Sequence, residues 1–152
     1  MFLLFTLMLG GAIILITVIM HALAYDWILK ILPRTASIFT KYFGHFWKII
    51  LLTFTVLCVL ITLFLDIWLW TFLLMIVDQT HLHDIETGLY FAATSFTTVG
   101  YGDVVLDKDW RLLGTICAIN GMFLFGWSAA FIYEIMTKLY QGEQLLKKKW
   151  DR

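Results

Sequence analysis

The chain has 152 residues, of which 61% are hydrophobic and only 14% are charged, and its net charge at pH 7 is zero. So few charged residues cannot cover the surface of a water-soluble domain of this size, and the mean hydropathy of +0.86 places most of the chain in lipid. The zero net charge favours no class of partner, and we expect no nucleic acid among the partners. Cys58 and Cys117 lie in apolar runs, which predicts free thiols rather than a disulfide framework.

Residues 1–20 carry no charge and are long enough to cross a bilayer as a helix. The motif Ala22-Leu23-Ala24 resembles a signal-peptide cleavage site, so removal of this segment is an alternative. The absence of a basic stretch before the apolar run favours a retained transmembrane helix over residues 1–24. That helix contains no arginine or lysine, which excludes a voltage sensor of the charged-helix type.

Residues 25–47 form an amphipathic segment rather than a span. Apolar and aromatic side chains lie on both sides of Pro33, with Lys41 among those that follow it. This pattern predicts either one or two short helices in the cytoplasmic interface of the membrane or a structured linker.

Residues 48–77 are predicted to be the second transmembrane helix, and Asp66 is its one charge inside the apolar run. Charges at membrane depth are rare and are usually paired or functional. At 1.5 Å per residue, Asp66 lies roughly 27 Å along the helix from Lys48, near the outer boundary. We expect either a structural carboxylate, paired with Arg111, or a regulatory residue.

The loop after residue 77 contains a short helix, predicted over residues 84–97. Asp84 can cap its N-terminus, and Glu86 lies in its first turn. The helix is too short to cross the membrane, and the two closely spaced glycines Gly100 and Gly102 require non-helical backbone after it. Such a re-entrant segment exists at membrane depth only where protein buries it or water lines it. His81 and His83 in the same loop either sense external pH or have no role.

Residues 97–103 read Thr-Thr-Val-Gly-Tyr-Gly-Asp, which resembles the selectivity filter of potassium channels at every position. The resemblance implies that the carbonyl groups of Thr98, Val99, Gly100 and Tyr101 replace the water shell of K+. It also implies that the Thr98 hydroxyl completes the innermost K+ site and that four chains close the ring. Gly100 and Gly102 would supply the positive φ angles that an alternating backbone requires.

The residues around this motif differ from the commonest bacterial pattern. Bacterial relatives often have two tryptophans before the filter, where this chain has Tyr90 and Phe91, and some have a glutamate where this chain has Thr94. We expect the Tyr90 hydroxyl to hydrogen-bond Asp103. The predicted supports of the filter are Tyr90, Thr94, Thr97 and Asp103. We expect filter inactivation to differ from that of relatives with the glutamate.

Residues 110–138 are predicted to form the third transmembrane helix. By its resemblance to the inner helix of pore-domain channels, Gly121 occupies the hinge position, although close helix packing would also favour glycine there. The same resemblance and the helical spacing identify a cavity-lining face, made of Met122, Phe125, Ala129 and Tyr133. Glu134 either concentrates cations at the inner mouth or pairs with Lys138.

The basic residues predict the orientation in the membrane. Nine of the eleven lie between the first and second apolar runs or after the third, four of them in the short basic tail at residues 140–152: Lys30, Arg34, Lys41, Lys48, Lys138, Lys147, Lys148, Lys149 and Arg152. By the positive-inside rule these regions face the cytoplasm, whereas the N-terminus and the acidic loop at residues 78–111 face outward.

Together these features predict an all-α membrane protein with three transmembrane helices, a re-entrant pore helix and a selectivity filter. The resemblance to bacterial two-helix potassium channels covers about residues 46–139, within which residues 48–139 are the expected pore domain. It implies a homotetrameric, K+-selective pore in a bacterial cell membrane, with lipids as neighbours, no organic cofactor and no enzymatic activity. The alternatives are a weakly selective cation channel and a non-conducting channel-like subunit; an intramembrane enzyme is disfavoured because no catalytic motif lies at membrane depth.

Overall fold

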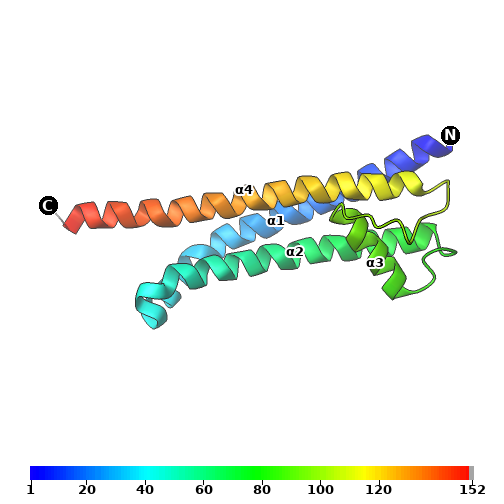
Figure 1. Cartoon of the computed structure of the whole chain (residues 1–152). Helices are drawn as coiled ribbons and strands as arrows, with labels where there is room; N and C mark the ends of the chain where they lie inside the picture. Colours follow the sequence, from blue (N-terminus) through cyan, green and yellow to red (C-terminus); the bar gives the residue numbers. More distant parts are fainter. Residues whose placement is uncertain (151–152) are drawn as a thin grey trace. The chain divides into compact units, whose positions relative to one another are not determined.

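The computed structural model describes the backbone of residues 1–150 and the side chains of residues 1–44 and 46–140. In that part of the chain every regular element is helical: α1 (Phe2–Phe43), the short 3-10 helix η1 (Gly44–Phe46), α2 (Trp47–Val77), α3 (Ile85–Phe96) and α4 (Arg111–Trp150) (Figure 1). Among these helices, α1, α2 and the part of α4 up to Tyr140 are long and apolar enough to cross a bilayer. The protein is therefore an all-α, multi-pass membrane protein, as its composition predicts.

The helix α1 is longer than the sequence predicts. Short helices separate from the first span were expected within residues 25–47, but α1 runs without interruption from Phe2 to Phe43 with Pro33 inside it. A proline removes one intrahelical hydrogen bond without always ending a helix. Nearby, the Thr35 hydroxyl donates to the carbonyl groups of Ile31 and Leu32, at 3.2 and 3.0 Å. The helix ends only where Gly44 takes a positive φ of 48°. A position of this segment in the membrane interface stays a prediction.

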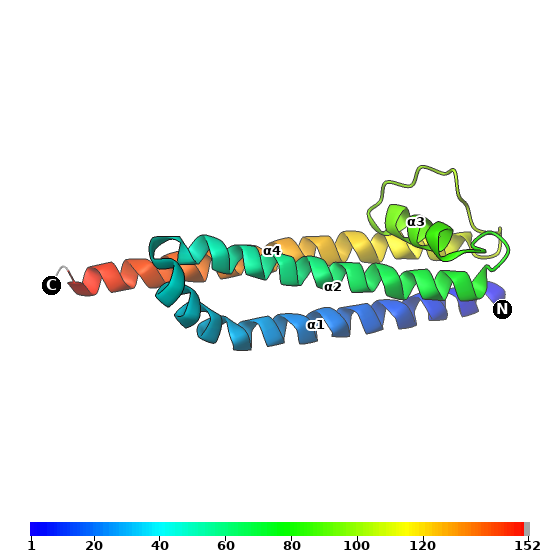
Figure 2. The same ribbon diagram turned by 90° about the horizontal axis from the view of Figure 1, so that it is seen from below.

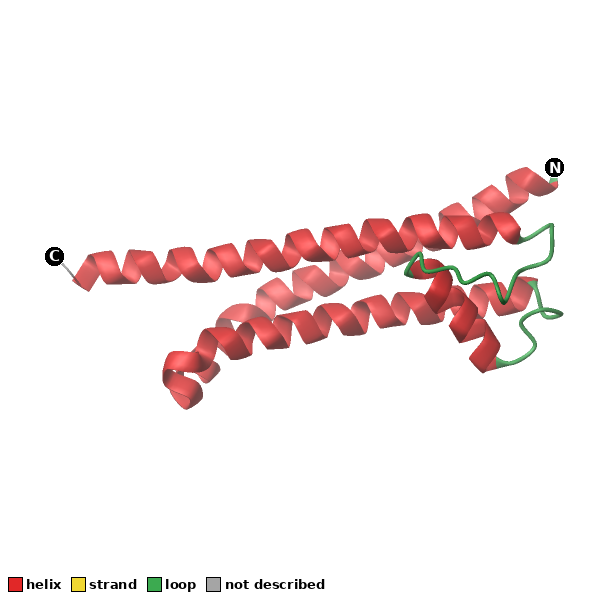
Figure 3. Ribbon diagram, in the orientation of Figure 1, coloured by secondary structure: helices red, strands yellow, loops and turns green. Residues whose placement is uncertain are grey.

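The short helix α3 begins and ends one residue inside the predicted range of 84–97, and the two end residues of that range, Asp84 and Thr97, are its caps. Asp84 has extended backbone and caps the helix, because its carboxylate accepts hydrogen bonds from the Thr87 N–H at 2.8 Å and from the Thr87 hydroxyl at 2.7 Å. The bond from the Thr87 N–H holds the pKa of Asp84 below its usual range. Irregular loops enter and leave α3 (Figure 3), and the loop that follows it contains residues 98–102.

The chain divides into two compact units. The first unit contains Met1–Ala22 and Ile61–Phe125, and therefore includes α3 and both of its loops. Side chains from all four of its helices fill its core, among them Ile13, Trp70, Phe96 and Leu113. Figure 2 shows α3 against the neighbouring parts of α2 and α4. Its Gly88 fits against Met75 of α2, since a Cβ there would lie 2.7 Å from the Met75 side chain.

The second unit contains Leu23–Leu60 and Gly126–Arg152. Its central contact is Tyr25 of α1, whose ring stacks on Phe131 of α4 with centroids 4.0 Å apart. The Tyr25 hydroxyl lies 2.7 Å from the hydroxyl of Ser128. Cys58 of this unit and Cys117 of the first unit are thiols outside any disulfide, as predicted. The predicted basic tail at residues 140–152 lies, apart from the Tyr140 side chain and the backbone up to Trp150, outside the described residues.

Candidate functional site

The backbone of residues 98–102 is left-handed at every second position. The φ angles are +62° at Thr98, +49° at Gly100 and +79° at Gly102. The glycines were expected to take positive φ, and they do. Thr98 was not expected to, since a β-branched residue with positive φ is strained. Alternating handedness turns successive peptide groups so that their carbonyl oxygens can face one axis.

The end of α3 fixes the start of this segment. The Thr98 N–H donates to the Ser95 carbonyl at 2.9 Å, and the Gly100 N–H donates to the Thr94 carbonyl at 3.0 Å. The Thr97 hydroxyl donates to the Ala93 carbonyl at 2.7 Å. The backbone of residues 98–100 is thus bonded directly to the last turn of α3, and the predicted supports Thr94 and Thr97 both take part.

Behind the segment, Tyr90 of α3 holds Asp103. The Tyr90 hydroxyl donates to Asp103 Oδ2 at 2.7 Å, which is the hydrogen bond expected from the sequence. This bond lowers the pKa of Asp103 and raises the pKa of Tyr90 from their ordinary values. The Thr94 hydroxyl instead donates within its own helix, to the carbonyl groups of Tyr90 and Phe91.

A second carboxylate ties the two loops together, and sequence reasoning missed it. Asp78, at the end of α2, is only 4% exposed. It accepts hydrogen bonds from the Asp107 N–H at 2.7 Å and from the His81 N–H at 3.2 Å, and His81 Nδ1 lies 3.0 Å away. Burial raises the pKa of Asp78, but these bonds outweigh burial and bring it below the usual range. The sequence feature that could have indicated this site is an aspartate directly after a transmembrane helix.

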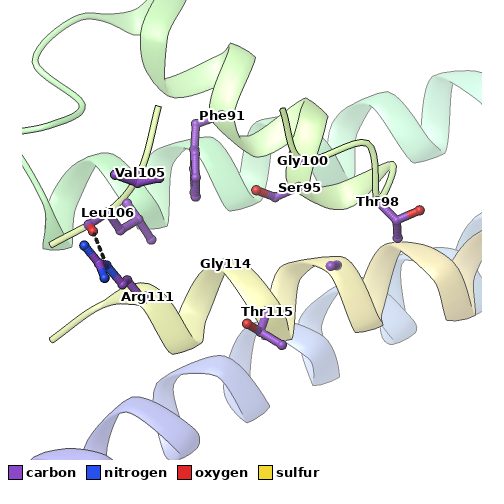
Figure 4. Close-up of a pocket in the computed structure, with 10 residues that line it drawn as sticks. Phe91, Ser95, Thr98, Gly100, Val105, Leu106, Arg111, Gly114 and Thr115 are labelled. Atoms are coloured by element: carbon purple, nitrogen blue, oxygen red, sulfur yellow. Dashed lines mark hydrogen bonds between the residues drawn. The ribbon is translucent and has the colours of Figure 1, made fainter. Parts of the chain in front are cut away.

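The side chains of the segment are uncovered in the single chain. Val99 is 52% exposed and Tyr101 is 73% exposed. A cavity of about 520 Å³ lies between the segment, α3 and the start of α4 (Figure 4), and it is lined by residues that include Phe91, Ser95, Thr98, Val105, Gly114 and Thr115.

The helix α4 packs tightly against α3 at Gly121. A Cβ built on Gly121 would lie 1.9 Å from the carbonyl oxygen of Phe96, the last residue of α3. Gly114 and Phe91 also approach closely, at 3.2 Å from a built Cβ to the ring. The glycine at position 121 is thus explained by packing, and bending at this position stays a prediction.

The partner expected for Asp66 was wrong. Asp66 Oδ2 lies 2.9 Å from His21 Nδ1 of α1, and both side chains are fully buried. Arg111 instead donates through Nε to the Leu106 carbonyl at 3.2 Å, the dashed bond in Figure 4. The pairing was missed because His21 lies 45 positions earlier, on a helix whose docking face the sequence did not define.

The predicted cavity-lining residues all have exposed side chains in the single chain. Met122 and Phe125 belong to the first unit, where they are 62% and 38% exposed. Ala129 and Tyr133 belong to the second unit, where both are also exposed. Glu134 pairs with Lys138 at 2.6 Å, which is one of the two roles expected for it.

Comparison with known proteins identifies the family. A family profile described as "Ion channel" matches residues 57–138, more than half of the chain. The chain is 29% identical over 69 residues to the voltage-gated potassium channel regulatory subunit KCNG3 of Mus musculus and of Homo sapiens, a match that covers 45% of this chain and 16% of each relative. It is 32% identical over 66 residues to the potassium voltage-gated channel subfamily A member 10 of Gallus gallus, covering 43% of this chain and 13% of the relative.

The chain spans less than a fifth of the length of these relatives. No solved structure matches it significantly. Because the profile covers more than half of the sequence, including α3, residues 98–102 and α4 to residue 138, the chain belongs to the ion channel family.

Proposed function

We propose that this ion channel family member is a potassium-selective pore, in which residues 98–102 of four identical chains form the selectivity filter. The observation that carries the proposal is the backbone of this segment. It combines the sequence Thr-Val-Gly-Tyr-Gly with left-handed φ angles at Thr98, Gly100 and Gly102. Rings of backbone carbonyls replace the hydration shell of K+ in potassium channels, and the named relatives are potassium channel proteins.

The electrostatics of α3 support the passage of a cation. Thr97, its C-cap residue, directly precedes the filter, and at the other end Asp84 caps the helix and Glu86 lies in its first turn. The C-terminal end of a helix carries partial negative charge. Four such ends, directed at a common axis below the filter, would stabilise a K+ ion there. Tyr90 and Asp103 would hold the outer end of the filter from behind.

A homotetramer accounts for the surfaces that a single chain leaves open. Val99 and Tyr101 point away from the carbonyl oxygens in our proposal, and they require a packed surface behind them to keep the pore at a fixed width. In the single chain these side chains are 52% and 73% exposed. Neighbouring copies would cover them, and the exposed Met122, Phe125, Ala129 and Tyr133 would line the central cavity.

The proposed location is a cell membrane of the bacterial type, with the N-terminus and the loop at residues 78–110 outside and the C-terminus in the cytoplasm. The basic residues between the first two spans and after the third support this orientation. Membrane lipids would surround the exposed apolar faces of α1 and α2.

A second candidate function is a channel subunit that regulates conduction by other chains without conducting as a homotetramer. This role is supported by the relative KCNG3, which is named as a regulatory subunit. In that case the filter segment would contribute one quarter of a mixed pore, and the purified chain alone would pass no ions.

Ion flux into liposomes separates the two candidates. We expect the purified protein to migrate as a tetramer in native mass spectrometry and to pass K+ and Tl+ but not Na+, with block by Ba2+. Equal flux of K+ and Na+ would contradict selectivity. A tetramer without flux in either orientation would favour the regulatory role.

A further inference from the structure

Within the first unit, the helix α1 carries two fully buried polar side chains on the face that meets α2 and α4. Thr17 and His21 are four residues apart, one helical turn, and both have no exposed surface. Polar groups buried at membrane depth need partners from neighbouring helices, because lipid offers none. Each of these two side chains finds its partner on a different helix.

Thr17 contacts Asn120 of α4. The Thr17 hydroxyl donates to the Ile14 carbonyl at 2.8 Å in its own helix, and it accepts from the Asn120 amide nitrogen at 2.9 Å. Asn120 is only 1% exposed. The hydroxyl oxygen also lies 3.3 Å from Asn120 Oδ1, but the Ile14 carbonyl is the closer acceptor, so we assign the threonine proton to Ile14 and the hydroxyl oxygen as the acceptor for the amide. This arrangement gives one preferred position of Asn120 relative to α1.

Asn120 is next to the residue that packs against the filter helix. A Cβ on Gly121 would overlap the Phe96 carbonyl at 1.9 Å, so α4 and the end of α3 are in direct contact here. The next residues after Phe96 are Thr97 and the strained Thr98. A rotation of α4 that moved Asn120 away from Thr17 would therefore also move the surface on which the filter helix rests.

The position of α1 itself is fixed at two more places in the same unit. His21 pairs with Asp66 of α2 at 2.9 Å, where both side chains are fully buried. Gly10 fits against Ile116 of α4, since a Cβ there would lie 2.8 Å from the Ile116 side chain. Ile116 and Asn120 are one turn apart, and both face α1.

We propose that Thr17 and Asn120 are positioning residues of the selectivity filter. Their hydrogen bond fixes the rotation of α4 at Gly121 and thereby the position of the Phe96 carbonyl. The proposal rests on the filter function proposed above. According to this proposal, α1 helps to position the filter and is more than an additional membrane anchor. Coupling of this kind passes through packed contacts, and it is measurable as a change at the distant site.

The test compares three variants of the full-length protein, each checked for tetramer formation. Thr17→Val removes the hydroxyl with little change of shape, and Thr17→Ser keeps it. Thr6→Val is the matched control, because Thr6 is 1% exposed on the same helix and its hydroxyl bonds the Phe2 carbonyl at 3.2 Å. Two quantities are measured: the K+ to Na+ flux ratio in liposomes, and the K+ concentration that half-protects the tetramer against heat.

For Thr17→Val we expect the flux ratio to fall and the half-protecting K+ concentration to rise by about fivefold, the size of effect that one interhelical hydrogen bond gives. Thr17→Ser and Thr6→Val should both behave like the parent. The proposal is overturned if Thr17→Val matches Thr6→Val, or if Thr17→Ser is as impaired as Thr17→Val. If the parent passes no K+ but is protected by it, conduction fails and the K+ titration still decides the role of Thr17. If K+ gives the parent no protection, both proposals fail.

Discussion

In the proposed filter, Gly100 is the residue at which backbone freedom and ion binding are most directly linked. Its φ is +49°, and a Cβ built on it would meet no atom of the chain within 4 Å. A substitution by alanine therefore tests the backbone conformation rather than a clash. A left-handed alanine costs about 1–2 kcal/mol, and in the proposed tetramer this cost arises in each of the four chains. We expect Gly100→Ala to lower K+ flux by at least about tenfold, the factor that a single 1.4 kcal/mol gives.

The matched control is Gly11→Ala. Gly11 lies inside α1, where a Cβ also has open space around it, and alanine favours the helix. Its K+ flux should equal that of the parent. Unchanged flux in Gly100→Ala would show that the carbonyl of residue 100 does not need its left-handed backbone.

Asp78 gives a prediction about pH. Its hydrogen bonds from Asp107 and His81 lower its pKa, so the folded state favours the ionised carboxylate. This stabilisation is complete above the ordinary carboxyl pKa of about 3.9, and it is lost as the pH falls through the lower folded value. We expect Asp78→Asn to reduce the free energy of unfolding by about 2 kcal/mol at pH 7, with a smaller difference near pH 3.

Heat denaturation of the purified protein at both pH values measures this effect. Asp109→Asn, which changes an exposed aspartate in the loop that contains Asp107, is the control and should leave the midpoint unchanged. An equal loss of stability at the two pH values would mean that the charge of Asp78 does not contribute.

At the scale of the elements, Gly121 and Gly126 separate packing from bending in α4. A Cβ at Gly121 would overlap the Phe96 carbonyl, whereas a Cβ at Gly126 would meet nothing within 4 Å. Overpacking of a tight contact costs about 1–3 kcal/mol. We expect Gly121→Ala to lower both the heat stability of the protein and its K+ flux, and Gly126→Ala to leave the heat stability unchanged. Normal stability with altered open probability in Gly121→Ala would instead support the hinge.

The elements also show what the sequence reveals and what it does not. The limits of α3 were predictable, because Asp84 is a strong cap and its bonds to Thr87 are local. The positive φ angles of Gly100 and Gly102 were predictable for the same reason. The length of α1 was not, because Pro33 is a frequent helix end that this helix tolerates. The partner of Asp66 was not, because the choice between His21 and Arg111 depends on which faces of three apolar helices meet.

At the scale of the whole molecule, the pair of His21 and Asp66 is a buried polar contact between two apolar helices. Its removal tests whether α1 is packed as part of the folded protein. Breaking one partner leaves an uncompensated buried group, which costs about 3–5 kcal/mol, whereas replacing both by apolar side chains is often nearly neutral. We expect His21→Leu and Asp66→Leu each to lower the yield and the heat stability of the purified protein strongly. The double variant should recover most of both.

The exposed pair of Asp26 and Lys30 on the same helix supplies the control, since its side chains are 56% and 74% exposed. Surface ion pairs contribute at most about 1 kcal/mol, so Lys30→Met should shift the heat midpoint little. The comparison distinguishes a docked helix from a membrane anchor. In an anchor that does not pack on the pore, both leucine variants would insert at least as well as the parent, because leucine favours lipid over a charged side chain. Single variants as stable as the parent would therefore contradict the docking of α1. A double variant as unstable as the worse single variant would show that the two side chains act separately.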